Sequence, residues 1–203
     1  MPTDDVAIAK SPPSLLNVPM LLTWARIALI PMVVGVFYLP DTWFPPRWQN
    51  VTACALFTVA AITDAVDGWY ARRFGQTTPL GAFLDPVADK LMVCAALVVL
   101  LALDRVDPFV ALVIVGREIT VSALREWMAQ VGASASVAVN WLGKLKTISQ
   151  MVAIPVLLYW DPLFGVIPVA PIGTLLIYVA AALTVYSMVY YLRLAWPHLS
   201  GRR

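Results

Sequence analysis

The sequence predicts an all-α integral membrane protein with six transmembrane helices. Hydrophobic residues make up 61% of its 203 residues and charged residues only 13%, and the mean hydropathy is +0.79. Soluble domains average about 45–50% apolar and 25% charged residues. The apolar residues gather in runs of about 20, the length that crosses a bilayer as a helix. Because no soluble domain or internal repeat interrupts these runs, we treat residues 1–203 as a single membrane domain.

Six apolar runs give the expected helices. They cover residues 20–39, 50–73, 82–103, 107–130, 141–160 and 170–193. Prolines and glycines separate the runs, and Pro31 and Pro155 lie inside runs, where we expect kinks that membrane helices tolerate. Residues 1–19 lack the features of a signal peptide, so the first run is expected to remain as a membrane anchor. Residues 3–17 could form a short interfacial helix, and residues 194–203 form a tail.

Basic residues indicate the orientation of the chain. With six spans and a cytoplasmic N-terminus, the outer connections hold only Arg47 and Arg105 of the 14 lysines and arginines. Cytoplasmic connections usually carry the excess of basic residues. The sequence therefore predicts that both termini lie on the cytoplasmic side. Tryptophans near the ends of the runs are expected to anchor at the interfaces; they are Trp43, Trp48, Trp141, Trp160 and Trp196.

Several functions are poorly supported by the composition. A net charge of +2 is too small to argue for a nucleic-acid partner. Cys54 and Cys94 stand inside apolar runs, without metal or disulfide spacing, and are interpreted as packing residues. His198 is the only histidine and lies near the C-terminus, so zinc chemistry and histidine-based nucleophilic catalysis are not indicated.

Four aspartates at membrane depth are the main functional signal. Asp64 and Asp67 are three residues apart, and Asp85 and Asp89 are four apart, so each pair lies on one face of a helix. An ionised aspartate at the bilayer centre costs roughly 2.5–3.5 kcal/mol on insertion scales, so the four require compensation. A short turn between the second and third runs brings the two pairs together.

Carboxylate oxygens are the ligands that Mg²⁺ and Mn²⁺ prefer, and four converging carboxylates can hold two ions suited to phosphoryl transfer. Gly68 and Gly81 would let a nucleotide or a helix approach the backbone, and Arg72 is placed to bind a phosphate or a carboxylate. In the competing interpretation the aspartates only form ion pairs or helix caps, but the local basic residues are too few to pair with all four.

The spacing Asp64-x2-Asp67-Gly68-x2-Ala71-Arg72-x8-Gly81-x3-Asp85-x3-Asp89 matches the signature of the CDP-alcohol phosphotransferase family at every fixed position. Residues 17–26, 117–126 and 143–147 also resemble segments of bacterial phosphatidylglycerophosphate synthases, a branch of that family. Met20 is one departure, because these enzymes commonly carry asparagine there.

This resemblance implies a homodimer in the bacterial cytoplasmic membrane, with six membrane helices and a site open to the cytoplasm. It also implies that an acceptor hydroxyl attacks the phosphorus linked to diacylglycerol in CDP-diacylglycerol, so that CMP leaves. By the same resemblance the four aspartates would hold two Mg²⁺ or Mn²⁺ ions, and Asp89 would also act as the base. The residues that would shape the CDP pocket are Gly68, Ala71, Arg72 and Gly81.

Basic residues in otherwise apolar helices indicate the kind of acceptor that would bind. They are Arg117, Arg125, Lys144 and Lys146. A basic pocket suits an anionic acceptor better than serine or choline. The resemblance favours sn-glycerol 3-phosphate, whereas charge alone would equally admit inositol phosphate. These side chains could instead snorkel or pair with Glu118 and Glu126, and Arg117 is especially suited to pair with its neighbour Glu118.

A small transporter that relays protons or binds Na⁺ through the same aspartates is a hypothesis from another class. Transporters usually place such acids near the midplane on broken helices, often within inverted repeats, and the sequence shows neither feature. Metal-dependent release of CMP from CDP-diacylglycerol would distinguish an enzyme from a transporter.

Overall fold

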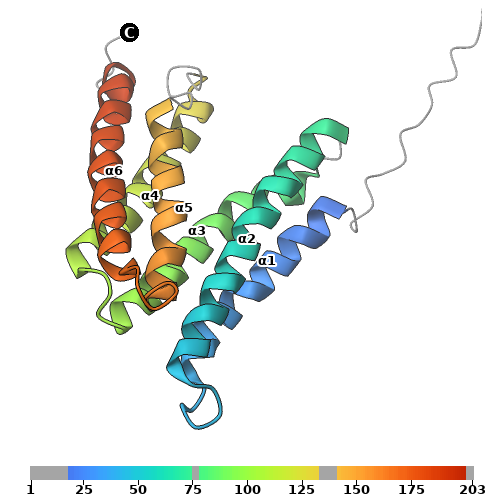
Figure 1. Cartoon of the computed structure of the whole chain (residues 1–203). Coiled ribbons are helices and arrows are strands. Elements are labelled where there is room, and N and C mark those ends of the chain that lie inside the picture. Colours follow the sequence, from blue (N-terminus) through green and yellow to red (C-terminus); the bar gives the residue numbers. More distant parts are fainter. Residues whose placement is uncertain (1–17, 75–77, 133–140, 200–203) are drawn as a thin grey trace, which may run out of the picture.

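A computed structural model describes residues 18–74, 78–132 and 141–199, and this part of the chain is helical with no β-strand. The helices are α1 (Val18–Gly35), α2 (Pro46–Phe74), α3 (Pro79–Ala102), α4 (Pro108–Gln130), α5 (Trp141–Tyr159) and α6 (Val169–Leu199), and a short 3₁₀ turn, η1 (Val36–Tyr38), extends α1 (Figure 1). The predicted fold class is confirmed. The predicted interfacial helix over residues 3–17 lies outside the described residues.

Local sequence fixes the starts of α3 and α4. Each helix begins with a proline, which has no N–H to leave unsatisfied at the first helical position. Each is preceded by an N-cap residue. The Thr78 hydroxyl accepts a hydrogen bond from the Gly81 backbone N–H at 3.0 Å, and the Asp107 carboxylate accepts one from the Phe109 N–H at 2.8 Å. The punctuation read from the sequence therefore corresponds to real helix boundaries.

The helices form a single bundle with a continuous core. In Figure 1, α1, α2 and α3 lie together, and α4, α5 and α6 lie beside them. Contacts join α1 to both α2 and α3, α5 to α6, α4 to α6, and α2 to α5. The core draws buried side chains from every helix, among them Val33, Phe57, Leu97, Ile114, Leu157 and Ile177. A smaller cluster joins α4 to α6 and consists of Val121, Leu124, Met128, Tyr191 and Ala195.

Three of the described helical segments are long and apolar enough to cross a membrane by length and composition: Met20–Tyr38, Pro46–Val66 and Val169–His198. Charged residues lie within α3 and α4, at Asp89 and Arg117 for example, and they reduce the apolar length of those helices. Large hydrophobic side chains on the outside of the bundle, such as Val98 on α3 and Leu112 on α4, are exposed as in a protein surrounded by lipid. The chain is an integral membrane protein.

A polar network closes the end of the bundle opposite the aspartates. Arg105, in the α3–α4 connection, donates hydrogen bonds to the Leu157 and Leu158 carbonyls at 3.2 and 2.9 Å and to Asn50 at 2.8 Å. Its guanidinium also lies 5.0 Å from the centre of the Trp160 ring. Burial lowers the pKa of Arg105, and the nearby Asp161 carboxylate opposes that shift. Arg105 therefore satisfies carbonyls in the last turn of α5.

The start of α2 differs from the prediction because polar side chains there are paired inside the bundle. We expected the span to begin at residue 50, but the helix starts at Pro46 and includes the polar residues Gln49 and Asn50. Both are buried and hydrogen bonded: Gln49 donates to the Phe44 carbonyl at 2.9 Å, and Asn50 donates to Asp161 at 3.0 Å. The polarity of each residue by itself suggests a loop, because it does not register the partners that satisfy these side chains inside the bundle.

We expect Gly173→Ala to destabilise the contact between α5 and α6. A Cβ at Gly173 would lie 2.8 Å from a methyl group of Leu157 and 3.0 Å from Val156, so the side chains of α5 would have to move. Overpacking of this kind costs roughly 1–3 kcal/mol. The test is thermal unfolding in detergent. The matched control is Gly116→Ala in α4, where a Cβ meets nothing within 4 Å; an equal loss of stability in both variants would contradict the prediction.

Candidate active site

A buried arginine joins the two predicted aspartate pairs. The Arg26 side chain of α1 is 1% exposed, and its Nη1 lies 2.8 Å from an oxygen of Asp64 on α2 and 2.8 Å from an oxygen of Asp89 on α3. Thr23, one turn earlier on α1, donates a hydrogen bond to Asp85 at 2.6 Å. Three helices therefore meet at these carboxylates, and the predicted approach of the second and third helices brings Asp64 and Asp89 together.

Sequence reasoning missed the role of Arg26. It counted only the basic residues near the motif and judged them too few to compensate the aspartates. A partner comes instead from the first helix, far away in the sequence. One signal could have identified it. Thr23 and Arg26 are three residues apart and so share a helix face, and a charged residue inside an apolar run needs a partner.

Some predicted site residues cannot be compared with the structure. The side chains of Asp67, Ala71, Arg72 and Lys144 lie outside the described part, although all four backbones are helical. Gly81 has a local structural role, because a Cβ there would lie 3.0 Å from the Thr78 hydroxyl that caps α3. Its predicted role at a nucleotide, like that of Gly68 in α2, stays a prediction.

The carboxylates have the right chemistry for a divalent metal. The side chains of Asp64 and Asp89 are 36% and 40% exposed, so both can be reached from outside the bundle. Since both contact the same nitrogen of Arg26, their oxygens lie within two hydrogen-bond lengths of each other, and such oxygens are the usual ligands of Mg²⁺ and Mn²⁺. Among the described side chains, no three acidic, cysteine or histidine groups are arranged to hold a metal ion. The two-ion arrangement therefore stays a prediction.

A cavity of about 500 Å³ lies between α3, α4 and α5, next to Asp89. This volume is typical of small-molecule sites. Its lining includes three of the four residues predicted to bind the acceptor phosphate, namely Arg117, Arg125 and Lys146. The other polar residues that line it are Asp89, Lys90, Glu118, Ser122, Thr147 and Gln150. Basic side chains outnumber acidic ones around this space, so an anion is the favoured ligand.

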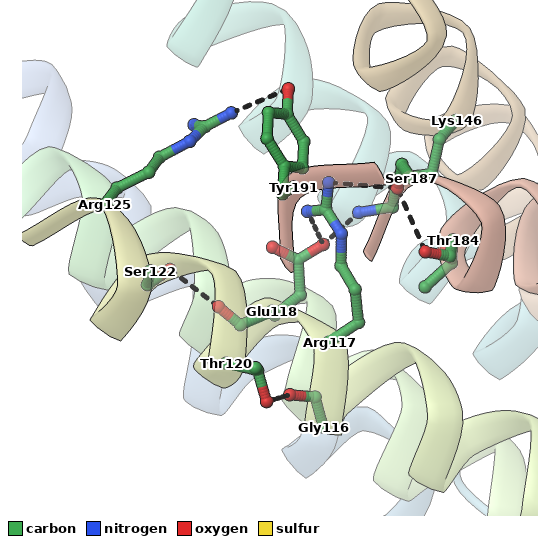
Figure 2. Close-up of polar contacts among 10 residues, drawn as sticks. All are labelled: Gly116, Arg117, Glu118, Thr120, Ser122, Arg125, Lys146, Thr184, Ser187 and Tyr191. Atoms are coloured by element: carbon green, nitrogen blue, oxygen red, sulfur yellow. Dashed lines mark hydrogen bonds and ion pairs between the residues drawn. The ribbon is translucent and has the colours of Figure 1, made fainter. Parts of the chain in front are cut away.

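The basic residues are held by specific partners, which Figure 2 shows. Arg117 lies 3.5 Å from the Glu118 carboxylate, and Lys146 contacts the same oxygen. The expected pairing of Arg117 with Glu118 is therefore confirmed, and Lys146 joins it from α5. Arg125 pairs differently: it donates a hydrogen bond to the Tyr191 hydroxyl at 3.2 Å and lies 5.1 Å from the centre of the Tyr191 ring (Figure 2).

The last helix contributes to the site, although its sequence looks generically apolar. Ser187 accepts a hydrogen bond from Arg117 at 3.3 Å, and Tyr191 holds Arg125. Both α6 residues are 1% exposed, and Tyr191 packs in the cluster between α4 and α6. Ser187 and one of the four tyrosines of α6 form no pattern that would have identified them from sequence.

Comparisons with known proteins agree with the signature. The family model for CDP-alcohol phosphatidyltransferase matches residues 16–189. Curated relatives from Shigella flexneri serotype 5b (strain 8401) and Escherichia coli (strain K12) are each 49% identical over 183 residues, which cover 88% of this chain and 94% of the relative. Both are named CDP-diacylglycerol–glycerol-3-phosphate 3-phosphatidyltransferase. The family-model match runs from the start of α1 into α6 and includes the residues that line the cavity, and the chain belongs to the CDP-alcohol phosphatidyltransferase family.

Proposed function

We propose that this protein transfers the phosphatidyl group of CDP-diacylglycerol to sn-glycerol 3-phosphate, giving phosphatidylglycerol phosphate and CMP in phospholipid biosynthesis. The relatives carry the name of this reaction. The observation that carries the proposal is the position of Asp89. It borders the basic cavity and also belongs to the group of carboxylates around Arg26. An acceptor bound in the cavity by its phosphate would thus have its hydroxyl near the carboxylates of the motif.

In the proposed reaction, the acceptor hydroxyl oxygen forms a bond to the phosphorus that carries diacylglycerol, and the bond from that phosphorus to CMP breaks. The hydroxyl proton passes to Asp89, which must come within hydrogen-bond reach of it. Asp64, Asp67, Asp85 and Asp89 would hold two Mg²⁺ or Mn²⁺ ions. When bound, such ions neutralise the pyrophosphate and lower the pKa of the attacking hydroxyl.

The remaining site residues have proposed binding roles. Gly68, Ala71, Arg72 and Gly81 would contact the CDP moiety, since they occupy fixed positions of the signature. Arg117, Arg125, Lys144 and Lys146 would bind the acceptor phosphate, because guanidinium and ammonium groups form strong charge-assisted hydrogen bonds to phosphate oxygens. Glu118 offsets only one of the two positive charges of Arg117 and Lys146, so a net positive charge is left for a phosphate.

We also propose that the protein is a homodimer in the bacterial cytoplasmic membrane, with both termini and the site on the cytoplasmic side. The distribution of basic residues supports this orientation. The predicted connections at the end of the bundle opposite the aspartates hold only Arg47 and Arg105 of the 14 lysines and arginines, and the side with few basic residues is usually the outer one. A site facing the cytoplasm can take a charged, water-soluble acceptor, while CDP-diacylglycerol comes from the surrounding lipid. We further propose that residues 1–203 form one domain.

The decisive experiment measures CMP release by purified protein with CDP-diacylglycerol and Mg²⁺. Glycerol 3-phosphate, inositol phosphate and serine are offered separately. We expect turnover with glycerol 3-phosphate only, and loss of that turnover when EDTA removes the metal. Turnover with inositol phosphate instead would leave the family assignment intact but contradict the acceptor. Absence of CMP with every acceptor, from protein that unfolds cooperatively on heating, would contradict the proposed activity.

A further inference from the structure

Gln150 lines the cavity and has no role in the mechanism above. Gln150 lies on α5 one turn after Lys146, so the two residues share a helix face. Its side chain is 2% exposed and lines the cavity. Its Oε1 accepts no hydrogen bond from any residue that the structure describes. Buried polar atoms nearly always have a partner, so a buried amide oxygen beside a cavity indicates that a ligand donates to it.

The chemistry of this oxygen restricts the ligand group. A carbonyl oxygen only accepts hydrogen bonds, so it would repel a phosphate oxygen but would accept a hydroxyl proton. Three cationic side chains, Arg117, Arg125 and Lys146, already line the same cavity and suit the phosphate. Two carboxylates also line the cavity, but Glu118 contacts both Arg117 and Lys146, and Asp89 contacts Arg26. Among the amide and carboxylate oxygens of the lining, that of Gln150 is therefore the one best placed to receive a hydroxyl.

The position of Gln150 also relates it to the reacting end of the acceptor. Met151, the next residue, borders the cavity and also a small space lined by Arg26, Asp64 and Asp89. Gln150 and Asp89 both line the cavity, so a ligand that fills it reaches both side chains. A group bound there would belong to the acceptor's carbon chain, close to the hydroxyl that attacks.

We propose that Gln150 is a specificity-determining residue that binds a non-reacting hydroxyl of a polyol phosphate acceptor. This inference rests on the proposed function. With glycerol 3-phosphate, the primary hydroxyl attacks, the phosphate binds the cations, and Gln150 accepts a hydrogen bond from the secondary hydroxyl. A site that is built to hydrogen-bond a hydroxyl discriminates against an analogue that lacks it.

The test compares glycerol 3-phosphate with 3-hydroxypropyl phosphate. This analogue keeps the phosphate and the reacting primary hydroxyl but lacks the secondary hydroxyl. We expect the wild-type kcat/KM to favour glycerol 3-phosphate about tenfold, the effect of roughly one hydrogen bond. Gln150→Leu should lower kcat/KM for glycerol 3-phosphate about tenfold and leave that for the analogue unchanged, so the preference disappears. The control is Ser149→Ala, a neighbouring change on α5 outside the cavity lining, which should keep the wild-type preference.

The outcomes separate this inference from the proposed function. An equal loss with both acceptors would mean that Gln150 binds the phosphate or supports the fold, and an unchanged preference would mean that it binds no hydroxyl; either result overturns the inference. If wild-type protein turns over neither acceptor, the proposed function fails and the inference fails with it. Gln150→Met provides a second variant of closer shape, and calorimetric binding of glycerol 3-phosphate, expected to weaken about tenfold in either variant, provides a readout without turnover.

Discussion

Asp89→Asn is expected to reduce CMP release by about 100- to 10,000-fold, the usual contribution of a positioned base. Asparagine has nearly the same shape as aspartate but cannot take the hydroxyl proton, and it is a weaker ligand for a divalent cation. It would also remove one of the two carboxylates that contact Arg26. Because the loss is chemical, it should appear mainly in kcat. The measurement is steady-state CMP release with saturating glycerol 3-phosphate.

The same substitution at the other end of the bundle is a stringent control. Asp104 is exposed and has a φ of 53°, a backbone conformation that asparagine adopts readily. Asp104→Asn therefore changes one acid to an amide without straining the chain, and it should retain near wild-type activity. Wild-type turnover by Asp89→Asn would remove this residue from the proposed mechanism.

Arg26→Leu is expected to destabilise the metal-free protein more than any other single change discussed above. Removing one partner of a buried ion pair costs about 3–5 kcal/mol, and the partial exposure of Asp64 and Asp89 reduces that to roughly 2–4 kcal/mol. For a domain of this size the melting temperature should fall by roughly 4–16 °C. The cause is repulsion between two neighbouring carboxylates that no longer share a cation.

Divalent metal gives this prediction a second readout. If Mg²⁺ binds the same carboxylates, it supplies the missing positive charge, so it should raise the melting temperature of Arg26→Leu more than that of the wild type. Arg47→Leu, an exposed change at the N-terminal end of α2, serves as the control and should melt like the wild type with and without Mg²⁺. An equal rise in all three proteins would show that Arg26 and the metal do not act on the same carboxylates.

Sequence reasoning predicted the helices well because each has a local signal. Apolar length identifies the spans, and Thr78 or Asp107 followed by proline marks two of the starts. It failed where partners are distant in the chain. Gln49 and Asn50 look like loop residues until their bonds to the Phe44 carbonyl and to Asp161 are known. No periodicity within a single helix carries that information.

The same limit applies to the site. Spacing alone was enough to group Asp64 with Asp67 and Asp85 with Asp89, because each pair lies on one helix. Three other residues of the site come from other helices: Arg26 from α1, Gln150 from α5 and Tyr191 from α6. Only tertiary packing brings them next to α3 and α4. The basic residues of the cavity were identified as charges in apolar surroundings, and the pairing of Arg117 with Glu118 was expected because they are neighbours in sequence. The contact of Lys146 with the same carboxylate joins α5 to α4 and has no local signal.

The position of Arg26 has a consequence for how the protein is made. α1 is synthesised before α2 and α3, so its arginine is made before either partner, and Asp89 follows 63 residues later. An isolated arginine at the centre of a span costs roughly 2.5–3.5 kcal/mol on insertion scales. The newly made first helix is thus only weakly held in lipid by itself, and its final placement depends on the arrival of α2 and α3. Biogenesis of this protein should therefore proceed through a three-helix unit, with the inserted state of α1 becoming secure only after the third helix has been translated.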